Sequence, residues 1–461
     1  MIDVVVIGGG AAGVNAAVIA ASSGCRVVLV DSGPGPGGQY YRGGPTGRFA
    51  EMCARLADLE RAGRVESLFS RYVYALERRD GAFRVRARGD DRHRGALRDI
   101  NARTVVVATG AFDRQLPFPG WDLPGVMAGG AAQALVKGSG VLPGRRIAVA
   151  GTGPFLLAVA ATILDAGGDV VAVIEANDPR ALASRVGSTL PVLGKTRELA
   201  GFVASLARHR VPYMRRARVT RAHGTDHLEA ITVSLVDPEW RAFPGTQREI
   251  QVDALAIGYG FTAQTDLLGA ARYVRGADGG IAVEVNDRQE TSVPGLFAAG
   301  ETTGVGGVDL AGYEGLLAGA AAAERCGLVP ALTARAETQT RRRVRDLRRF
   351  ATALHESFPV REGWRGDVEE GTLVCRCEEV PVSAVRQAMT LGATDARSVK
   401  LMTRAGMGWC QGRVCGRIVD GLCGFDDLAS LVGAATRPVA APVPLGALAA
   451  AIHGGDRMGT S

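Results

Sequence analysis

The stretch Val4-Val-Val-Ile-Gly-Gly-Gly-Ala-Ala-Gly13 lies close to the first residue of the chain and decides its fold. Its apolar half, mostly β-branched, predicts a strand buried on both faces, as in a parallel sheet. Its glycine-rich half predicts the turn into a helix. Gly8 allows the tight turn, Gly10 lets a pyrophosphate approach the backbone, and Gly13 lets the helix pack closely on the strand. The stretch therefore predicts the opening of a dinucleotide-binding βαβ unit.

The residues that follow complete this unit. The Ala-rich segment 14–22 predicts the helix, and segment 25–30 predicts a second strand that ends at Asp31. The helix N-terminus would face the phosphates of a bound dinucleotide, and Asp31 is placed to accept hydrogen bonds from its ribose. A glycine-rich turn without a ligand is the alternative, and the register of strand, helix and acid makes it the weaker interpretation.

The whole chain has the composition of a multidomain globular α/β protein. Its 461 residues are 47% hydrophobic and 22% charged, with 63 glycines and a formal net charge of +7. Such a length allows two or three domains. A phosphate-bearing cofactor or an acidic protein explains the charge as well as nucleic acid does, and no nucleic-acid-binding module accompanies it. The sequence begins without the basic region of a leader and contains no apolar run long enough for a transmembrane segment. We expect a cytoplasmic location, with a membrane-peripheral one as the alternative.

Two later segments indicate which dinucleotide binds. Segment 104–110 is a strand that ends in Ala-Thr-Gly, and segment 291–301 is a strand that ends in Ala-Gly-Glu. Together with the N-terminal glycines they resemble the two-dinucleotide-binding-domain flavoproteins, and this resemblance implies FAD. It also implies that Glu301, where the family usually has Asp, holds the ribityl chain. The helix that points at the flavin pyrimidine would begin near Gly307 and Val308.

A second βαβ unit spans residues 145–175 and departs from the fingerprint. The first two glycines are present, but Pro154 lies in the turn and Leu156 takes the place of the third glycine. Both changes alter the approach of a pyrophosphate and the packing of the helix. Glu175 would favour a ribose hydroxyl over a 2′-phosphate if a nucleotide binds. Weak, different or no nucleotide binding is favoured over a functional NAD(P) site, and both stay open.

Four of the eight cysteines form the pairs Cys375-x-Cys377 and Cys410-x4-Cys415. In a reducing compartment clustered cysteines are more often metal ligands or redox groups than disulfides. Four thiolates suit tetrahedral zinc or a [2Fe-2S] cluster. Nearby glycines expose N–H groups that stabilise a cluster, and a flavin needs a one-electron outlet, so we favour the cluster over zinc and over unliganded thiols. Small buried apolar roles are expected for the other cysteines, Cys25, Cys53, Cys326 and Cys423.

With these residues in view, the chain resembles the larger, α-type subunit of heteromeric FAD-dependent amine and amino-acid dehydrogenases. This group includes the α-type subunits of opine oxidase, hydrogen cyanide synthase and the dye-linked proline and hydroxyproline dehydrogenases. The cysteine segment resembles the bacterioferritin-associated-ferredoxin-like [2Fe-2S] module. The resemblance runs over nearly the whole chain, and its specific marks are segments 37–42, 116–120, 151–154, 299–301, 375–415 and 437–446.

The resemblance implies an electron-transfer subunit. In these complexes a smaller β subunit, related to glycine and D-amino-acid oxidases, oxidises the amine at its own FAD. The α subunit carries FAD and the cluster and passes electrons on to a small-molecule acceptor or quinone, in some members with FMN at the subunit interface. No amine-oxidising constellation is found in this sequence, so the catalytic residues are unknown. Two alternatives stay open: a self-sufficient NAD(P)H-dependent FAD/iron–sulfur oxidoreductase, and a scaffold subunit with a structural flavin and zinc.

We therefore expect an α/β fold with two Rossmann-like dinucleotide-binding domains and a small, mostly helical C-terminal [2Fe-2S] domain. The first domain is discontinuous in this prediction, because segment 252–261 is interpreted as returning the chain to it. The arginine-rich segment 341–349 is expected to be a solvated or interdomain helix, with docking of an acidic partner or a nucleotide as the alternative. The expected boundaries are 1–120 and 252–330 for the FAD-binding domain, 121–251 for the second domain, 331–367 for a linker, 368–435 for the [2Fe-2S] domain and 436–461 for the tail.

The candidate site residues come from these motifs. Gln39 is included by the resemblance alone. The candidate FAD-binding residues are Gly8, Gly10, Ala12, Gly13, Asp31, Gly38, Gln39, Arg42, Thr109, Gly110, Gly300, Glu301, Gly307 and Val308. The candidate cluster ligands are Cys375, Cys377, Cys410 and Cys415.

Overall fold

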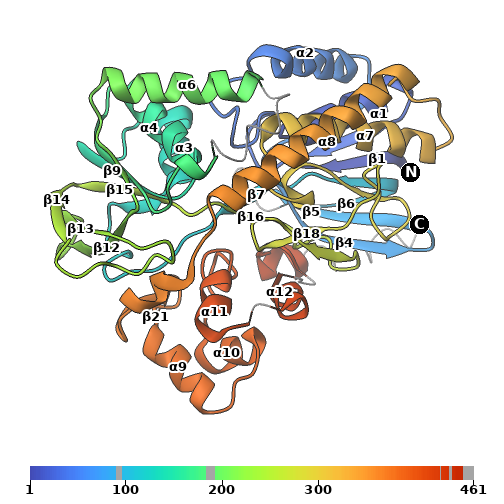
Figure 1. Cartoon of the computed structure of the whole chain (residues 1–461). Helices are drawn as coiled ribbons and strands as arrows, with labels where there is room; N and C mark the ends of the chain where they lie inside the picture. The colour runs from blue at the N-terminus through green and yellow to red at the C-terminus, as the bar shows by residue number, and fades with distance from the viewer. Residues whose placement is uncertain (90–95, 183–192, 426, 436–438, 450–461) are drawn as a thin grey trace.

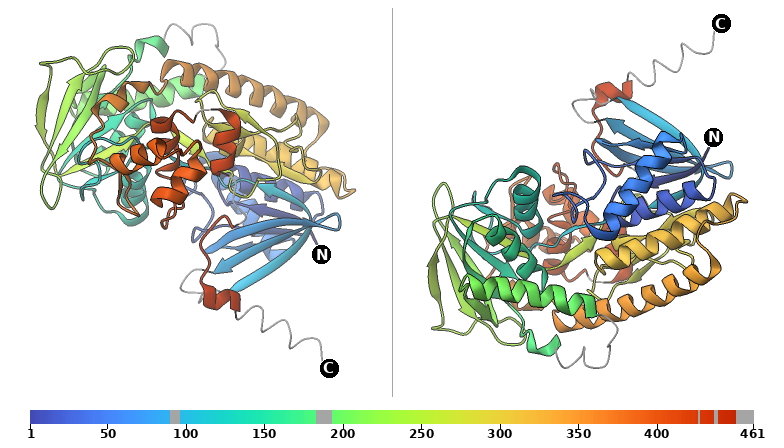
Figure 2. Two further views of the ribbon diagram at one scale, coloured as in Figure 1. Left: turned by 90° about the horizontal axis from the view of Figure 1, so that it is seen from below. Right: turned by 90° about the horizontal axis from the view of Figure 1, so that it is seen from above.

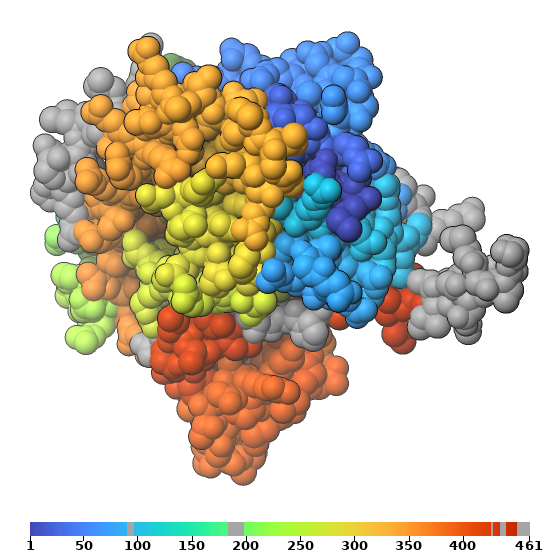
Figure 3. Space-filling model, turned by 90° about the vertical axis from the view of Figure 1, so that its right-hand side faces the viewer, coloured from blue at the N-terminus to red at the C-terminus, as the bar shows by residue number. Residues whose placement is uncertain are grey.

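The computed structural model describes residues 1–89, 96–182, 193–425, 427–435 and 439–449, so much of the expected tail, including part of segment 437–446, lies outside the described residues. Two units that each contain a sheet lie next to each other, and a small module of short helices lies below them (Figure 1). The space-filling view shows this C-terminal module, coloured orange to red, projecting from the rest of the molecule (Figure 3). Within the described ranges no helix has both the length and the apolar composition that crossing a membrane requires.

The first unit is built on a seven-stranded sheet of order β3-β2-β1-β6-β5-β4, with β19 also paired to β6. Strand β1 is central and parallel to both neighbours, which explains why its apolar residues are buried on both faces. The long strand β6 pairs antiparallel with β5 through its first half and parallel with β19 near its end. The strands are β1 (Ile2–Ile7), β2 (Val27–Val30), β3 (Val65–Leu68), β4 (Arg71–Arg79), β5 (Ala82–Gly89), β6 (Leu97–Val107) and β19 (Leu296–Ala298).

Helices α1 and α7 pack tightly against each other in the first unit. A Cβ atom on Gly315 of α7 would lie 2.1 Å from the carbonyl oxygen of Ala12, and one on Gly319 would lie 2.4 Å from that of Ala16. The two backbones can approach this closely only because glycine has no side chain. Helix α8 occupies most of the expected linker and packs on α7 (Figure 2). The helices are α1 (Ala11–Ser22), α2 (Gly47–Arg61), α7 (Val308–Arg325) and α8 (Ala334–Ser357).

The second unit is built on a five-stranded parallel sheet of order β11-β10-β9-β15-β8. An antiparallel sheet of β12, β13 and β14 lies beside it, and three helices complete the unit. Its elements are β8 (Val126–Ala128), α3 (Gly129–Ser139), β9 (Arg146–Gly151), α4 (Phe155–Asp165), β10 (Asp169–Glu175), α6 (Leu193–Arg208), β11 (Tyr213–Arg215), β12 (Ala217–His223), β13 (Ala230–Leu235), β14 (Arg248–Gln251) and β15 (Ala254–Gly258).

Strand β15 corrects one expectation about the chain path. The expected return to the first domain at residue 252 is too early, because β15 pairs with β8 and β9 of the second sheet. A continuous apolar run suits an interior strand of either sheet, so the sequence alone does not assign it. The chain crosses back directly afterwards, where β16 (Phe261–Ala263) pairs antiparallel with β7 (Ala111–Asp113). The remaining elements of the first unit are β17 (Tyr273–Arg275), β18 (Ile281–Val283) and η2 (Gly300–Thr303).

The C-terminal module shares a hydrophobic core with the second unit. Trp121 of the second unit is fully buried in one cluster with Val385 of the module, and its indole N–H donates to the carbonyl oxygen of Leu373 at 2.7 Å. An ion pair between Arg218 and Asp367 joins the same two parts. The elements of the module are η3 (Glu362–Asp367), β20 (Leu373–Cys375), β21 (Val380–Pro381), α9 (Val382–Thr390), α10 (Ala396–Thr403), α11 (Gly416–Cys423) and α12 (Leu428–Ala435).

Replacing Trp121 by alanine is expected to destabilise the protein by roughly 3–5 kcal/mol, because it opens a cavity in the shared core and removes the hydrogen bond to Leu373. The measurement is the midpoint of thermal unfolding followed by circular dichroism. Trp409→Ala is the control, because Trp409 is 79% exposed and its loss should leave the midpoint unchanged. An unchanged midpoint for Trp121→Ala would contradict the shared core.

Candidate functional site

The three fingerprint glycines have three different surroundings. Gly8 has a φ of 110°, and a Cβ there would lie 2.1 Å from the carbonyl oxygen of Ala108. A Cβ on Gly13 would lie 1.7 Å from the carbonyl oxygen of Gly8, so this glycine fixes the packing of α1 on β1. Gly10 faces open space, with no described atom within 4 Å of its Cβ position. This space at the N-terminus of α1 fits a pyrophosphate group.

Asp31 lies at the edge of this space. Its carboxylate accepts hydrogen bonds from the backbone N–H groups of Gly9 and Gly33, both at 2.6 Å. These bonds fix the orientation of the carboxylate, and the side chain stays partly exposed. Asp31 is therefore oriented and accessible, as an acceptor for ribose hydroxyls must be.

The loop that contains Gly38 covers the fingerprint. A Cβ on Gly38 would lie 3.2 Å from the Cα of Gly10, so the structure brings these two candidate residues together. Gln39 and Arg42 are both exposed, and the Arg42 side chain lies against Gly138 of α3. Contact of Gln39 and Arg42 with a cofactor stays a prediction.

The end of β6 forms a second side of the site. The hydroxyl of Thr109 donates to the carbonyl oxygen of Gln264 at 2.7 Å, and the N–H of Gln264 donates to the carbonyl oxygen of Gly110 at 2.9 Å. Gly110 has a φ of 80° and open space at its Cβ position. These bonds tie the Ala-Thr-Gly turn to the segment that follows β16.

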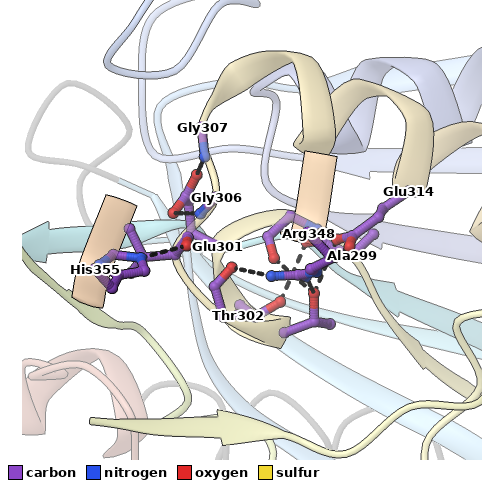
Figure 4. A network of polar contacts seen from close by, with 12 residues as sticks. Ala299, Glu301, Thr302, Gly306, Gly307, Glu314, Arg348 and His355 are labelled. Atoms are coloured by element: carbon purple, nitrogen blue, oxygen red, sulfur yellow. Dashed lines mark hydrogen bonds and ion pairs between the residues drawn. The ribbon is translucent and has the colours of Figure 1, made fainter. Parts of the chain in front are cut away.

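Gly300 and Glu301 lie where α1 meets α7. A Cβ on Gly300 would lie 3.1 Å from the Cβ of Ala12, which places these two candidate residues side by side. The Glu301 carboxylate accepts hydrogen bonds from the N–H groups of Gly306 at 3.1 Å and Gly307 at 2.8 Å (Figure 4). Burial raises the pKa of Glu301, and these two bonds oppose that shift. Helix α7 begins at Val308, as the sequence predicts.

A buried polar network supports this loop from behind (Figure 4). Arg348 of α8 donates to Glu314 of α7 and to the hydroxyl of Thr303, both at 2.5 Å, and to the carbonyl oxygen of Gly304 at 2.6 Å. The other carboxylate oxygen of Glu314 accepts from the N–H of Gly300 at 2.9 Å and from Thr303 at 2.8 Å. Burial raises the pKa of Glu314, and the Arg348 guanidinium lowers it. The network fixes the backbone that precedes α7.

The sequence analysis missed both charged members of this network. Glu314 is an acid inside an otherwise small and apolar helix, which was the available signal for a buried, paired carboxylate. Arg348 gave no comparable signal, because it is one of six arginines within nine residues. Its partner depends on how α8 packs on α7.

The four clustered cysteines meet as two pairs. Cys375 is hydrogen-bonded to Cys415, and Cys377 is in contact with Cys410. The bond to Cys415 lowers the pKa of Cys375 to about 5, and the N–H groups of Gly406, Glu378 and Cys377 act in the same direction. In the described chain no three or more Cys, His, Asp or Glu side chains gather as a group that could hold a single metal ion. Two sulfur pairs with surrounding N–H donors fit a two-iron cluster.

The glycines around the cysteines are required by space. A Cβ on Gly408 would lie 2.2 Å from the Cβ of Cys377. Gly406 and Gly412 have φ values of 84° and 79°, which favour glycine. Cys375 and Cys415 are buried whereas Cys377 is exposed, so the site has an inner and an outer side. Among the other cysteines only Cys25 is fully buried, and Cys53, Cys326 and Cys423 are partly exposed, in contrast to the expectation.

The second unit uses its nucleotide-type acid internally. The Glu175 carboxylate, which is 0% exposed, accepts hydrogen bonds from the hydroxyl of Thr152 and from the N–H groups of Gly153 and Asn177, at 2.7, 2.7 and 2.8 Å. Burial raises the pKa of Glu175 to about 7 despite these bonds. A ribose hydroxyl cannot reach this carboxylate without displacing them.

The segment after α8 lies over the same turn. The Asn177 amide donates to the carbonyl oxygen of Pro359 at 2.9 Å, and a Cβ on Gly153 would lie 3.9 Å from the Cβ of Phe358. The phosphate-facing side of the second fingerprint is therefore in contact with this chain's own residues 358–359. Leu156, in place of a third glycine, is buried in the core of the second unit.

The fold and these sites define a flavoprotein with two dinucleotide-binding units and an added four-cysteine module. The family model described as pyridine nucleotide-disulphide oxidoreductase matches residues 2–327, and the one described as BFD-like [2Fe-2S] binding domain matches residues 373–422. The chain belongs to the pyridine nucleotide-disulphide oxidoreductase family. It is an FAD-dependent oxidoreductase with a [2Fe-2S] binding domain, as the sequence predicts.

Similar proteins cover nearly the whole chain. An opine oxidase subunit from Agrobacterium tumefaciens, the one designated A, is 31% identical over 455 residues, which cover 90% of this chain and 84% of the relative. Hydrogen cyanide synthase subunit HcnB from Pseudomonas aeruginosa is 31% identical over 430 residues, which cover 89% and 90%. In the solved structure of L-proline dehydrogenase from P. horikoshii, the fold is similar with a TM-score of 0.67 at 20% identity, over 97% of this chain and 79% of that one. The expected relationship is confirmed.

Gly10→Val is expected to weaken FAD binding about tenfold or more without unfolding the chain, because Gly10 has an ordinary φ of −77° and the valine would fill the open space. The flavin-to-protein ratio and the thermal midpoint are measured together. Gly13→Ala is the comparison, and it should lower the midpoint because its Cβ meets the Gly8 carbonyl. Full flavin content in Gly10→Val would contradict the assigned space.

Cys375→Ala is expected to abolish iron binding, because it removes a buried thiolate and leaves three ligands. Iron, zinc and acid-labile sulfide are measured on the purified protein. Cys423→Ala is the matched control within the same module and should retain the metal. Zinc without labile sulfide in the unmodified chain would contradict the two-iron interpretation.

Proposed function

We propose that the chain is the FAD- and [2Fe-2S]-containing electron-transfer subunit of a heteromeric dehydrogenase. The substrate is an amine or amino acid of opine, proline, hydroxyproline or glycine type, oxidised on a smaller FAD-containing β subunit. Electrons reach this chain from that partner and leave to a small-molecule acceptor or quinone. Two relatives support the proposal because they are subunits by name, one of opine oxidase and one of hydrogen cyanide synthase.

The observation that carries the proposal is the internal use of Glu175. NAD(P)H would need this acid for its ribose and the turn at Gly153 for its pyrophosphate. The acid is buried and hydrogen-bonded to this turn, and residues 358–359 lie over it. A nicotinamide donor therefore lacks its two main contacts, and an electron source outside this chain is required.

The residues of the first unit fit their proposed tasks. Asp31 would accept hydrogen bonds from the ribose of FAD, and Glu301 would accept them from the ribityl chain. The N-terminus of α7 would place its N–H groups and positive dipole toward the flavin. When bound, FAD supplies a two-electron carrier and the cluster a one-electron carrier. Arg348 and Glu314 hold the loop that presents Glu301, and the two cysteine pairs hold the cluster.

Three further features belong to this proposal. We assign the FAD-binding domain to residues 1–120 and the segment after β15, with β15 counted in the second domain. A cytoplasmic or membrane-peripheral location and an FMN at the interface with the β subunit are retained from the sequence analysis. The linker, the [2Fe-2S] domain and the tail keep their expected boundaries.

An anaerobic absorbance titration of the purified chain tests the electron source. NADH, NADPH and dithionite are added in turn while the flavin and iron–sulfur bands are followed. We expect dithionite to bleach both bands and the two nicotinamides to bleach neither, because the second unit cannot place them. Dithionite serves as the internal control for reducible cofactors. Stoichiometric bleaching by NADH or NADPH would overturn the subunit proposal in favour of a self-sufficient reductase.

A further inference from the structure

The loop between Cys410 and Cys415 carries an arginine whose side chain leaves the module. The Nη2 atom of Arg413 donates to the carboxylate of Asp266 at 3.1 Å and to the carbonyl oxygen of Ala440 at 2.7 Å. The side chains of Arg413 and Asp266 are only 23% and 9% exposed, so water screens their attraction weakly. The loop that supplies two cluster ligands is thus bonded directly to the first unit.

Asp266 lies close to the candidate flavin site along the chain. It comes two residues after Gln264, which is hydrogen-bonded to both Thr109 and Gly110. Thr109 and Gly110 form the side of the site at the end of β6. A short series of bonded residues therefore connects the flavin site to the cysteine loop.

The face of the module that meets the first unit is positively charged. Arg417 of α11 donates to the carbonyl oxygen of Gly279 at 3.1 Å. Arg114, next to β7, is buried, and burial together with the charge of Arg417 lowers its pKa to about 10. The Nε–H of Arg413 is buried and has no acceptor within the described part of the chain. Positive charge and a spare donor therefore lie on the side of the module that the first unit covers.

We propose that Arg413 and Asp266 are positioning residues whose ion pair holds the Cys410–Cys415 loop against the side of the flavin site. We also assign to the Arg413 charge a preference for the reduced cluster, because reduction adds one negative charge to a site of four thiolates and cluster potentials respond to nearby charge. The proposal rests on the proposed function in one respect, since it requires flavin and cluster in the same chain.

Two substitutions separate the positional effect from the effect of charge. Arg413→Gln breaks the ion pair and removes a positive charge. Asp266→Asn breaks the same pair and removes a negative charge. Both should loosen the loop, whereas their effects on the cluster potential should have opposite signs.

The experiment uses the full chain with flavin and cluster bound. Hydrogen–deuterium exchange is measured for peptides covering residues 406–418 and 262–270, and the cluster midpoint potential is measured by a dithionite titration followed by electron paramagnetic resonance. We expect exchange in these peptides to be about tenfold faster in both variants. The potential should fall in Arg413→Gln and should not fall in Asp266→Asn. Arg413→Lys, which retains the charge, should keep a potential near that of the unmodified protein.

Arg404→Gln is the matched control. Arg404 also forms an ion pair near the cluster ligands, with Glu378 at 2.9 Å, but this pair stays inside the module and the Arg404 side chain is 68% exposed. Its loss should leave exchange in peptide 262–270 unchanged and shift the potential less than Arg413→Gln does, because water screens an exposed charge.

Two results would overturn the inference. Unchanged exchange in both Arg413→Gln and Asp266→Asn would exclude the positioning role, and an unchanged potential in Arg413→Gln would exclude the role of its charge. If Arg413→Gln does not fold, Asp266→Asn still decides the positioning role. Reduction of the chain by NADH would overturn the proposed function and leave these exchange results interpretable.

Discussion

Helix α1 touches the backbone of its neighbours on two sides, and the positions of both acids of the flavin site follow from this contact. Gly13 lies against the carbonyl oxygen of Gly8, and Gly315 of α7 lies against that of Ala12. Because no side chain separates these elements, the ends of β1, β2 and β19 open onto one space. A single added methyl group at either glycine would have to move a helix. The location of Asp31 relative to Glu301 is therefore set by the absence of side chains elsewhere.

Burial of the Glu314 carboxylate carries a large desolvation cost, which its partners must offset. The side chain accepts hydrogen bonds from Gly300, Thr303 and Arg348, so both of its oxygens are satisfied. Arg348 comes from α8, which follows the nucleotide-binding fold in the sequence. The shape of the loop at Glu301 thus depends on a helix outside the fingerprint, and that same helix leads into residues 358–359, which cover the second turn.

The sequence predicts those parts of the site that are local in the chain. The glycine fingerprint, the start of α7 and the two cysteine pairs each depend on residues a few positions apart, and their spacing is enough. The sheet of β15 could not be predicted, because an apolar strand of that length fits either sheet. The pairing of Arg348 with Glu314 and the burial of Glu175 depend on the packing of distant segments. Composition and spacing carry no information about such packing.

The C-terminal module is attached to both units at once. Trp121 and Arg218 hold it on the second unit, and Arg413 and Arg417 hold it on the first. Any hinge motion between the units would have to break one of these two sets of contacts. The second unit thereby acts as a foundation for the module, and the gap between the two redox centres stays constant through turnover. The molecule works as a fixed conductor, and no swinging part is needed to carry charge across it.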